Sequence, residues 1–282
     1  MELGIVVLPT DQSAPIDQLA VEIESRGLGS LYVGGDHTHI PAIRTTPFPG
    51  GGEIPDEYCR TLDPFVALTL AASRTSRIRL GTCIFLSAQR DTISTAKQVA
   101  SLDFVAGGRV DFGVGYGWNV EEAADHGVTW GQRRAIVREQ MLAMKALWTE
   151  EEASFDGEYV SFDRAWMRPK PKSSPHPRIM VGASPGPRSF ASILEWGDGW
   201  FPVPFWGHTP KDVETLRDAA ADAGRNPDEL AIIVDGVMPD PAMLDPWRAL
   251  DIEGALIPVP SEGLDTVCPL LDSAAALIER YR

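Results

Sequence analysis

A short polar run, Asp36-His37-Thr38-His39, follows the apolar segment 30–34. A carboxylate can orient a ring or accept a hydrogen bond, and an imidazole can exchange a proton near neutral pH. If segment 30–34 is a barrel strand, this run lies at its carboxyl end, where barrel enzymes hold their catalytic groups. We therefore expect Asp36 and His37 to be catalytic. The alternative is that Asp36 and His37 cap the loop. For His39, the alternative is that it only packs against neighbouring side chains.

Two histidines spaced like His37 and His39 also occur in metal-dependent barrel hydrolases. Such a site needs further histidine, lysine or aspartate ligands from later strands. His208 follows the sixth expected strand, but segments 182–184 and 256–259, which end the fifth and the eighth, offer no ligand. We therefore expect no metal site.

Two glycine-rich segments follow other apolar runs. Residues 107–119 pass through Gly115 and end in Trp118-Asn119, and residues 182–188 read Gly-Ala-Ser-Pro-Gly-Pro-Arg. Glycine lets the backbone approach a ligand closely, and free N–H groups at a helix start beside Ser184 and Arg188 suit a phosphate. The alternatives are tight strand–helix packing and a plain proline turn. Together the two segments favour a flat ring bound against the backbone.

Cys83 ends the apolar run before Ile84-Phe85. A nucleophilic cysteine needs a base or cation that lowers its pKa, and none is adjacent in sequence. We expect Cys83 to be a small buried residue beside a ligand. Trp118, Trp200 and Trp206 follow strand ends and could line a pocket, with core or interface positions as the alternative.

The elements that must position these residues alternate along the chain. Short runs rich in β-branched residues predict parallel strands covered on both faces. The eight runs are residues 3–8, 30–34, 78–84, 109–115, 178–182, 199–203, 229–236 and 254–259.

Helices are predicted between the strands. Ile16, Leu19, Ala20 and Ile23 form a helical stripe that Gly27 would end. The pairs Asp63-Pro64, Thr209-Pro210 and Asp245-Pro246 each combine an N-cap residue with a proline at the first helical position.

About eight strands alternating with about eight helices predict one (β/α)₈ TIM-like barrel domain over residues 1–282. A doubly wound sheet is the competing fold, but residues 8–12 are not the GxGxxG turn that it needs after its first strand. Two long insertions, 36–60 after the second strand and 149–177 before the fifth, lack periodicity. Long loops in a compact domain are usually functional.

Composition narrows the function classes. The chain has 282 residues, with 40 acidic against 25 basic side chains and a net charge of -15. This charge disfavours nucleic-acid and polybasic membrane binding. Three scattered cysteines indicate a reducing compartment, and the amino-terminal residues do not resemble a signal peptide. We expect a soluble, cytoplasmic protein.

The motifs together resemble the luciferase-like monooxygenase superfamily, and within it the F420-dependent oxidoreductases of actinobacteria. The resemblance covers most of the chain. It is densest in RIRLGT (77–82), AKQVASLD (96–103), GGRV (107–110) and GWNVEE (117–122), and it continues in GEY (157–159), PKP (169–171), GAS (182–184) and GRNPDEL (224–230).

The resemblance implies a barrel that binds a deazaflavin or flavin at its carboxyl-terminal mouth. In this family the ring lies against a non-proline cis peptide bond, which by motif would join Cys83 to Ile84. The implied acidic–histidine pair is Asp36-His37. The residues expected to bind the cofactor are Asp36, Cys83, Ile84, Phe85, Gly115, Trp118, Asn119, Gly182, Ala183, Ser184 and Arg188.

The resulting hypothesis is hydride transfer between F420 and a small organic substrate, with His37 as proton donor or acceptor and Asp36 at the polar edge of the ring. The alternatives are an FMN monooxygenase served by a flavin reductase, a metal-dependent hydrolase and a non-catalytic cofactor-binding protein. The resemblance also implies a homodimer and an F420-reducing enzyme as an indirect partner.

Overall fold

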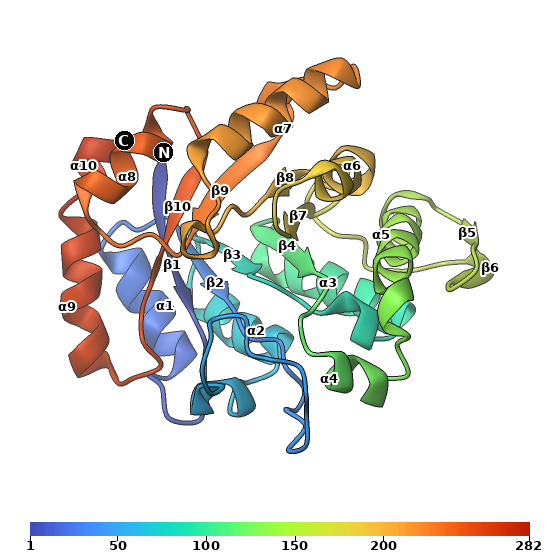
Figure 1. Ribbon diagram of the computed structural model, residues 1–282, viewed down its shortest axis with the longest axis horizontal. Helices are drawn as coiled ribbons and strands as arrows, with labels where there is room; N and C mark the ends of the chain where they lie inside the picture. The colour runs from blue at the N-terminus through green and yellow to red at the C-terminus, as the bar shows by residue number, and fades with distance from the viewer.

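All eight apolar runs form strands, and these close into one parallel barrel in the computed structural model, which describes residues 1–282 (Figure 1). Around the barrel the order is β1-β10-β9-β8-β7-β4-β3-β2. The strands are β1 (Glu2–Val7), β2 (Ser30–Val33), β3 (Arg79–Thr82), β4 (Val110–Gly115), β7 (Arg178–Gly182), β8 (Gly199–Trp200), β9 (Ala231–Asp235) and β10 (Gly254–Pro258). The predicted (β/α)₈ barrel is confirmed.

Burial on both faces explains why these strands read as continuous apolar runs. All four residues of β2 are buried, as are five of the six in β1. Alternate side chains fill the inside of the barrel and the layer beneath the helices, as the pleat requires. The buried side chains inside the barrel come from six segments: Val6, Tyr32, Met180, Phe201, Ala231, Ile233 and Leu256.

Helices surround the barrel (Figure 1). They are α1 (Ile16–Ser25), α2 (Pro64–Arg74), α3 (Thr92–Ala106), α4 (Val120–Asp125), α5 (Arg133–Thr149), α6 (Pro187–Trp196), α7 (Pro210–Asp222), α8 (Pro241–Arg248), α9 (Leu264–Ala275) and α10 (Ile278–Tyr281). None of them has both the length and the apolar character needed to cross a membrane.

Two of the three predicted helix starts are confirmed. Asp63 caps α2 by accepting hydrogen bonds from two N–H groups of its first turn, and Thr209 forms a capping box at α7. The third prediction is wrong, because α8 begins at Pro241 under an Asp240 cap and contains Pro246 in its interior. The Asp245 carboxylate instead accepts hydrogen bonds from Arg280 and Tyr281 of α10.

The two insertions differ in structure. The first follows β2 and contains only one short 3₁₀ helix, η1 (Asp56–Cys59), before α2 begins. The second contains an antiparallel hairpin, β5 (Ala153–Asp156) with β6 (Ser161–Ala165), which lies beside α5 at the edge of the molecule (Figure 1). The expectation that this second segment lacks periodic structure is therefore corrected.

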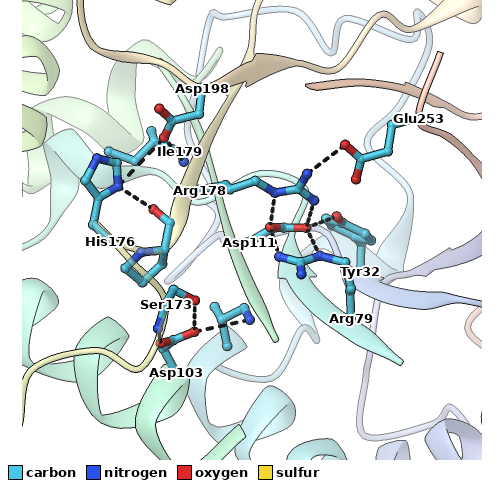
Figure 2. Close-up of polar contacts among 12 residues, drawn as sticks. Tyr32, Arg79, Asp103, Asp111, Ser173, His176, Arg178, Ile179, Asp198 and Glu253 are labelled. Atoms are coloured by element: carbon cyan, nitrogen blue, oxygen red, sulfur yellow. Dashed lines mark hydrogen bonds and ion pairs between the residues drawn. The ribbon is translucent and has the colours of Figure 1, made fainter. Parts of the chain in front are cut away.

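A buried carboxylate closes the amino-terminal end of the barrel (Figure 2). Asp111, at the start of β4, accepts hydrogen bonds from Arg79, Arg178 and the Tyr32 hydroxyl, and Arg178 also reaches Glu253. Burial alone would raise the pKa of Asp111, but the hydrogen bonds and charges of the two arginines outweigh it and lower this pKa to about 2. Every polar group in this network has a partner, so this end of the barrel serves stability.

Candidate functional site

His37 and Glu122 form a buried pair at the opposite, carboxyl-terminal end of the strands. The Nδ1 atom of His37 lies 2.7 Å from Oε2 of Glu122, and the two side chains are 5% and 0% exposed. Glu122 comes from α4, which follows β4, whereas His37 follows β2. The carboxylate fixes the imidazole with Nδ1–H directed at Glu122, which leaves Nε2 as the acceptor nitrogen.

Aromatic side chains enclose the free edge of His37. The indole Nε1 of Trp118 donates to His37 Nε2 over 3.2 Å, and the rings of Trp118 and Tyr58 each lie 5.5 Å from the imidazole centroid. Phe48 packs against both of these rings. Trp118 therefore contacts His37, whereas Trp200 is fully buried in the core and Trp206 is 56% exposed.

Asp36 is buried but does not contact His37. Its Oδ2 accepts the Leu86 N–H over 2.8 Å, its Oδ1 pairs with Arg90, and Arg90 also holds Asp63 over 3.0 Å. Burial raises the pKa of Asp36 to about 6, against the opposing charge of Arg90 and the Leu86 hydrogen bond. The group that orients the imidazole is thus Glu122, and Asp36 ties the end of β2 to the segment after β3.

The peptide bond between Cys83 and Ile84 is cis, as the resemblance implies. Ile84 occupies space that side chains on two glycines would take, since a Cβ on Gly115 or Gly182 would lie 2.4 Å from its atoms. Phe85 is fully buried, and its N–H and C=O both pair with backbone of the β4 strand. Gly115, Gly182 and Phe85 therefore form the support beneath Cys83–Ile84.

A second buried carboxyl group lies beside Cys83. Asp235 ends β9, and its Oδ2 accepts the Cys83 thiol over 3.4 Å. Burial raises the pKa of Asp235 to about 6, and burial with the nearby Asp235 charge raises that of Cys83 far above its ordinary value. Cys83 is therefore a protonated, half-buried thiol and not an activated nucleophile, in line with the expectation from its neighbours.

The turn after β7 leads into the first turn of α6 next to an arginine with a free donor. Arg134 of α5 lies over the Tyr116 ring at 4.0 Å and reaches Ser189 of α6 over 3.5 Å. Its Nη1 and the Tyr116 hydroxyl are buried without a hydrogen-bond partner. Ser184 and Arg188 are exposed on the same turn and helix start. Buried donors without partners at a helix N-terminus suit an anion such as a phosphate.

The insertion after β2 is fastened to α4. Glu121 accepts hydrogen bonds from the N–H and hydroxyl groups of Thr45 and Thr46, and Asp125 pairs with His39 over 2.9 Å. Asn119 caps α4 through Glu122 N–H, while its buried Nδ2 has no partner. The insertion thereby covers one side of the mouth and carries Phe48 and Tyr58 to His37.

Three functional candidates were not singled out by the sequence patterns. Glu122 stands within the GWNVEE motif, and Asp235 is the one acidic residue within its strand, so both had a signal in the sequence. Arg134 lies on a helix far along the chain, where only the fold brings it to the β7 turn. No group of three or more His, Cys, Asp or Glu side chains is arranged to hold a metal ion.

A cavity of about 490 Å³ lies between α6 and α7, away from His37. Its lining is mainly apolar and includes Pro185 and Pro187 of the turn after β7, with Asp212 as its one charged group. It does not contain the residues expected to be catalytic.

The profile of the luciferase-like monooxygenase family matches residues 1–238. An uncharacterized protein of Mycobacterium tuberculosis (strain H37Rv) is 40% identical over 99% of this chain and 97% of its own length. A phthiodiolone/phenolphthiodiolone dimycocerosates ketoreductase of Mycobacterium kansasii is 30% identical over 71% of this chain and 56% of its own length.

Solved structures share the fold at lower identity. The monooxygenase RslO1 from Streptomyces bottropensis superposes with a TM-score of 0.84 at 23% identity, over 100% of both chains. An F420-dependent secondary alcohol dehydrogenase bound to an F420–acetone adduct gives 0.76 at 18% identity, over 100% of this chain and 99% of the other. The oxygenating constituent of 3,6-diketocamphane monooxygenase from Pseudomonas putida, with FMN, gives 0.66 at 19%, over 84% and 67%. This chain is therefore an enzyme of the luciferase-like monooxygenase family.

Proposed function

We propose that this enzyme transfers a hydride between the deazaflavin F420 and a small organic substrate, with a carbonyl and its alcohol as the reacting pair. The observation that carries this proposal is the mouth itself, which combines an anion cradle at the α6 start with an apolar floor at Cys83–Ile84 and a buried His37–Glu122 pair. The ketoreductase relative and the F420-dependent alcohol dehydrogenase fold support the choice of reaction.

The residues present fit a phosphorylated deazaflavin or flavin. The unpartnered Arg134 Nη1 and Tyr116 hydroxyl, with Ser184, Arg188 and the backbone of Gly182 and Ala183, would hold the phosphate. Cys83, Ile84 and Trp118 would contact the ring, with Gly115, Phe85 and Asn119 supporting them from behind. When bound, the cofactor supplies the hydride chemistry.

His37 would move the proton that accompanies the hydride. Its Nε2 is the nitrogen that faces the aromatic enclosure, and Glu122 stabilises the imidazolium that forms when Nε2 takes a proton. For this step the hydrogen bond from the Trp118 indole to His37 Nε2 has to break, so that Nε2 can contact the substrate oxygen. Asp36 would act at the ring edge only if it exchanged one of its present partners, Leu86 N–H or Arg90.

The test is a titration of the purified enzyme with F420 and with FMN, followed by turnover with ketones and secondary alcohols. F420 binding with turnover of this pair supports the proposal. Tight binding of FMN alone, with oxygen-dependent turnover, would instead support the two-component monooxygenase, the candidate that the FMN-containing neighbour favours. The variant His37→Ala tests the role of His37 in turnover. It should still bind F420 but should not turn over the substrate.

Four further points remain predictions: a single domain over residues 1–282, a cytoplasmic location, a homodimer and an indirect partner that reduces the cofactor. Light scattering and limited proteolysis test the dimer and the single domain directly.

A further inference from the structure

Asp36, Glu122 and Asp235 are carboxyl groups withdrawn from solvent at the carboxyl-terminal end of the barrel, and the first two hold parts of the protein in place. Both oxygens of Asp36 are taken, by Leu86 N–H and by Arg90. Glu122 is fully buried: its Oε2 holds His37, and its Oε1 has no partner but is closed off from solvent. Asp235 alone combines a half-buried position with an oxygen, Oδ1, that no side chain occupies.

The fold holds Asp235 firmly in this position. Its N–H donates to Pro202 O over 2.9 Å, the following Gly236 N–H donates to Leu256 O over 3.1 Å, and the thiol of Cys83 occupies Oδ2. Cys83 also lies against the end of β2, since a Cβ on Gly34 would stand 3.0 Å from Cys83 O, and His37 follows Gly34 by three residues. Asp235 and His37 therefore both belong to the carboxyl-terminal mouth.

The rim next to Asp235 is apolar. In the loop after β8, Phe205 is 75% exposed and Trp206 is 56% exposed. In the loop after β9, Met238 is 47% exposed. These two loops are neighbours, since the side chain of Val203 lies 3.9 Å from where a Cβ on Gly236 would stand. An apolar rim around one accessible carboxyl group suits a ligand with one polar function on an apolar body.

We propose that Asp235 binds the oxygen of the substrate's alcohol or ketone group opposite His37, and that the substrate is an apolar molecule whose body leaves the mouth over Phe205, Trp206 and Met238. This inference deepens the proposed function and rests on it. An ionised Asp235 accepts a hydrogen bond from a hydroxyl group, and a protonated one donates to a carbonyl oxygen. Burial raises its pKa to about 6, so both forms are within reach near neutral pH.

The first experiment measures kcat and KM of the F420-loaded enzyme with straight-chain 2-alkanols and 2-alkanones of increasing length. Asp235→Ala should lower kcat/KM about 10- to 100-fold at every length, as expected for one lost hydrogen bond to a charged group. Asp235→Asn should keep more of the ketone affinity than of the alcohol affinity, because its amide donates to a carbonyl. Wild-type kcat/KM should rise with chain length.

The control variant is Asp228→Asn, an exposed carboxylate just before the opposite end of β9. It should leave both kinetic constants unchanged. If Asp235→Ala binds F420 normally and keeps kcat/KM within twofold of wild type, the inference is refuted while the proposed function stands.

The second experiment needs no cofactor and decides the inference even if F420 does not bind. Binding of 2-decanone to the cofactor-free protein is followed by quenching of tryptophan fluorescence, because Trp118 and Trp206 lie at the mouth. Wild type and Asp228→Asn should bind the ketone about 10- to 100-fold more tightly than Asp235→Ala. Equal Kd values for wild type and Asp235→Ala, or no binding to wild type, would overturn the assignment.

Discussion

Replacement of Arg134 by alanine tests the anion cradle at the start of α6. The guanidinium is anchored over Tyr116 at 4.0 Å and near Ser189 at 3.5 Å, yet its buried Nη1 has no partner in the protein. A hydrogen bond between this group and a phosphate is charge-assisted, and such bonds contribute about 1.5–3 kcal/mol. Arg134→Ala should therefore raise the Kd of F420 about 10- to 100-fold, measured by quenching of tryptophan fluorescence.

The matched control lies one turn further along the same helix. Arg138 also reaches α6, where it pairs with Glu195 over 2.8 Å. Unlike Arg134, it is 49% exposed and already has a carboxylate partner. Arg138→Ala should cost at most about 1 kcal/mol of stability and leave the Kd of F420 unchanged. Thermal unfolding of both variants shows that they are folded. If both bind F420 equally well, the phosphate assignment at Arg134 is wrong.

Three further predictions concern the barrel ends and the enclosure. Asp111→Asn should destabilise the protein by about 3–5 kcal/mol at neutral pH in urea unfolding, because it breaks a buried ion pair. The pKa of Asp111 is lowered to about 2, so its ionised form contributes roughly 2 kcal/mol that is fully present above about pH 4 and is lost as the pH falls toward 2; this acid sensitivity should be absent from the variant. Glu122→Gln should lower kcat at least about tenfold with F420 affinity retained, and a kcat equal to wild type would contradict its role in holding His37. Gly182→Ala should destabilise the protein by about 1–3 kcal/mol, since its Cβ would lie 2.4 Å from Ile84, and Ile84→Ala in the same chain should restore part of that loss in calorimetry.

The strands could be predicted from sequence because burial on both faces leaves a local trace. All eight predicted runs lie within a few residues of their strands. The largest error is in 199–203, because β8 ends at Trp200, and the start of 229–236 belongs to the 3₁₀ helix η5 (Pro227–Glu229). The failed helix start at Asp245-Pro246 has a physical reason. A cap and a proline also occur inside a helix when the proline falls in its second turn and the acid finds partners elsewhere, here Arg280 and Tyr281.

The site was harder to predict because its pairs form across strands. Asp36 and His37 are neighbours in the sequence, but their side chains contact different partners: Asp36 pairs with Arg90, and His37 pairs with Glu122. The cis peptide bond at Cys83–Ile84 could be predicted only from the family resemblance, because no local sequence pattern indicates it. The Arg134 cradle joins α5 to α6, and no spacing along the chain contains that contact.

The Asp111 network and the Arg134–Tyr116 pair differ in how their polar groups are satisfied, and this contrast argues for a ligand at the mouth. At the amino-terminal end, Asp111 is surrounded by two arginines and a tyrosine that use both of its oxygens (Figure 2). At the mouth, Arg134 Nη1 and Tyr116 Oη are buried without partners. Each unsatisfied buried group costs about 1–3 kcal/mol, and these two lie in contact beside the start of α6, so a ligand that binds there would satisfy both at once. F420 should accordingly raise the unfolding temperature of the protein. Arg134→Ala should make this increase smaller, whereas Asp111→Asn should leave the increase unchanged.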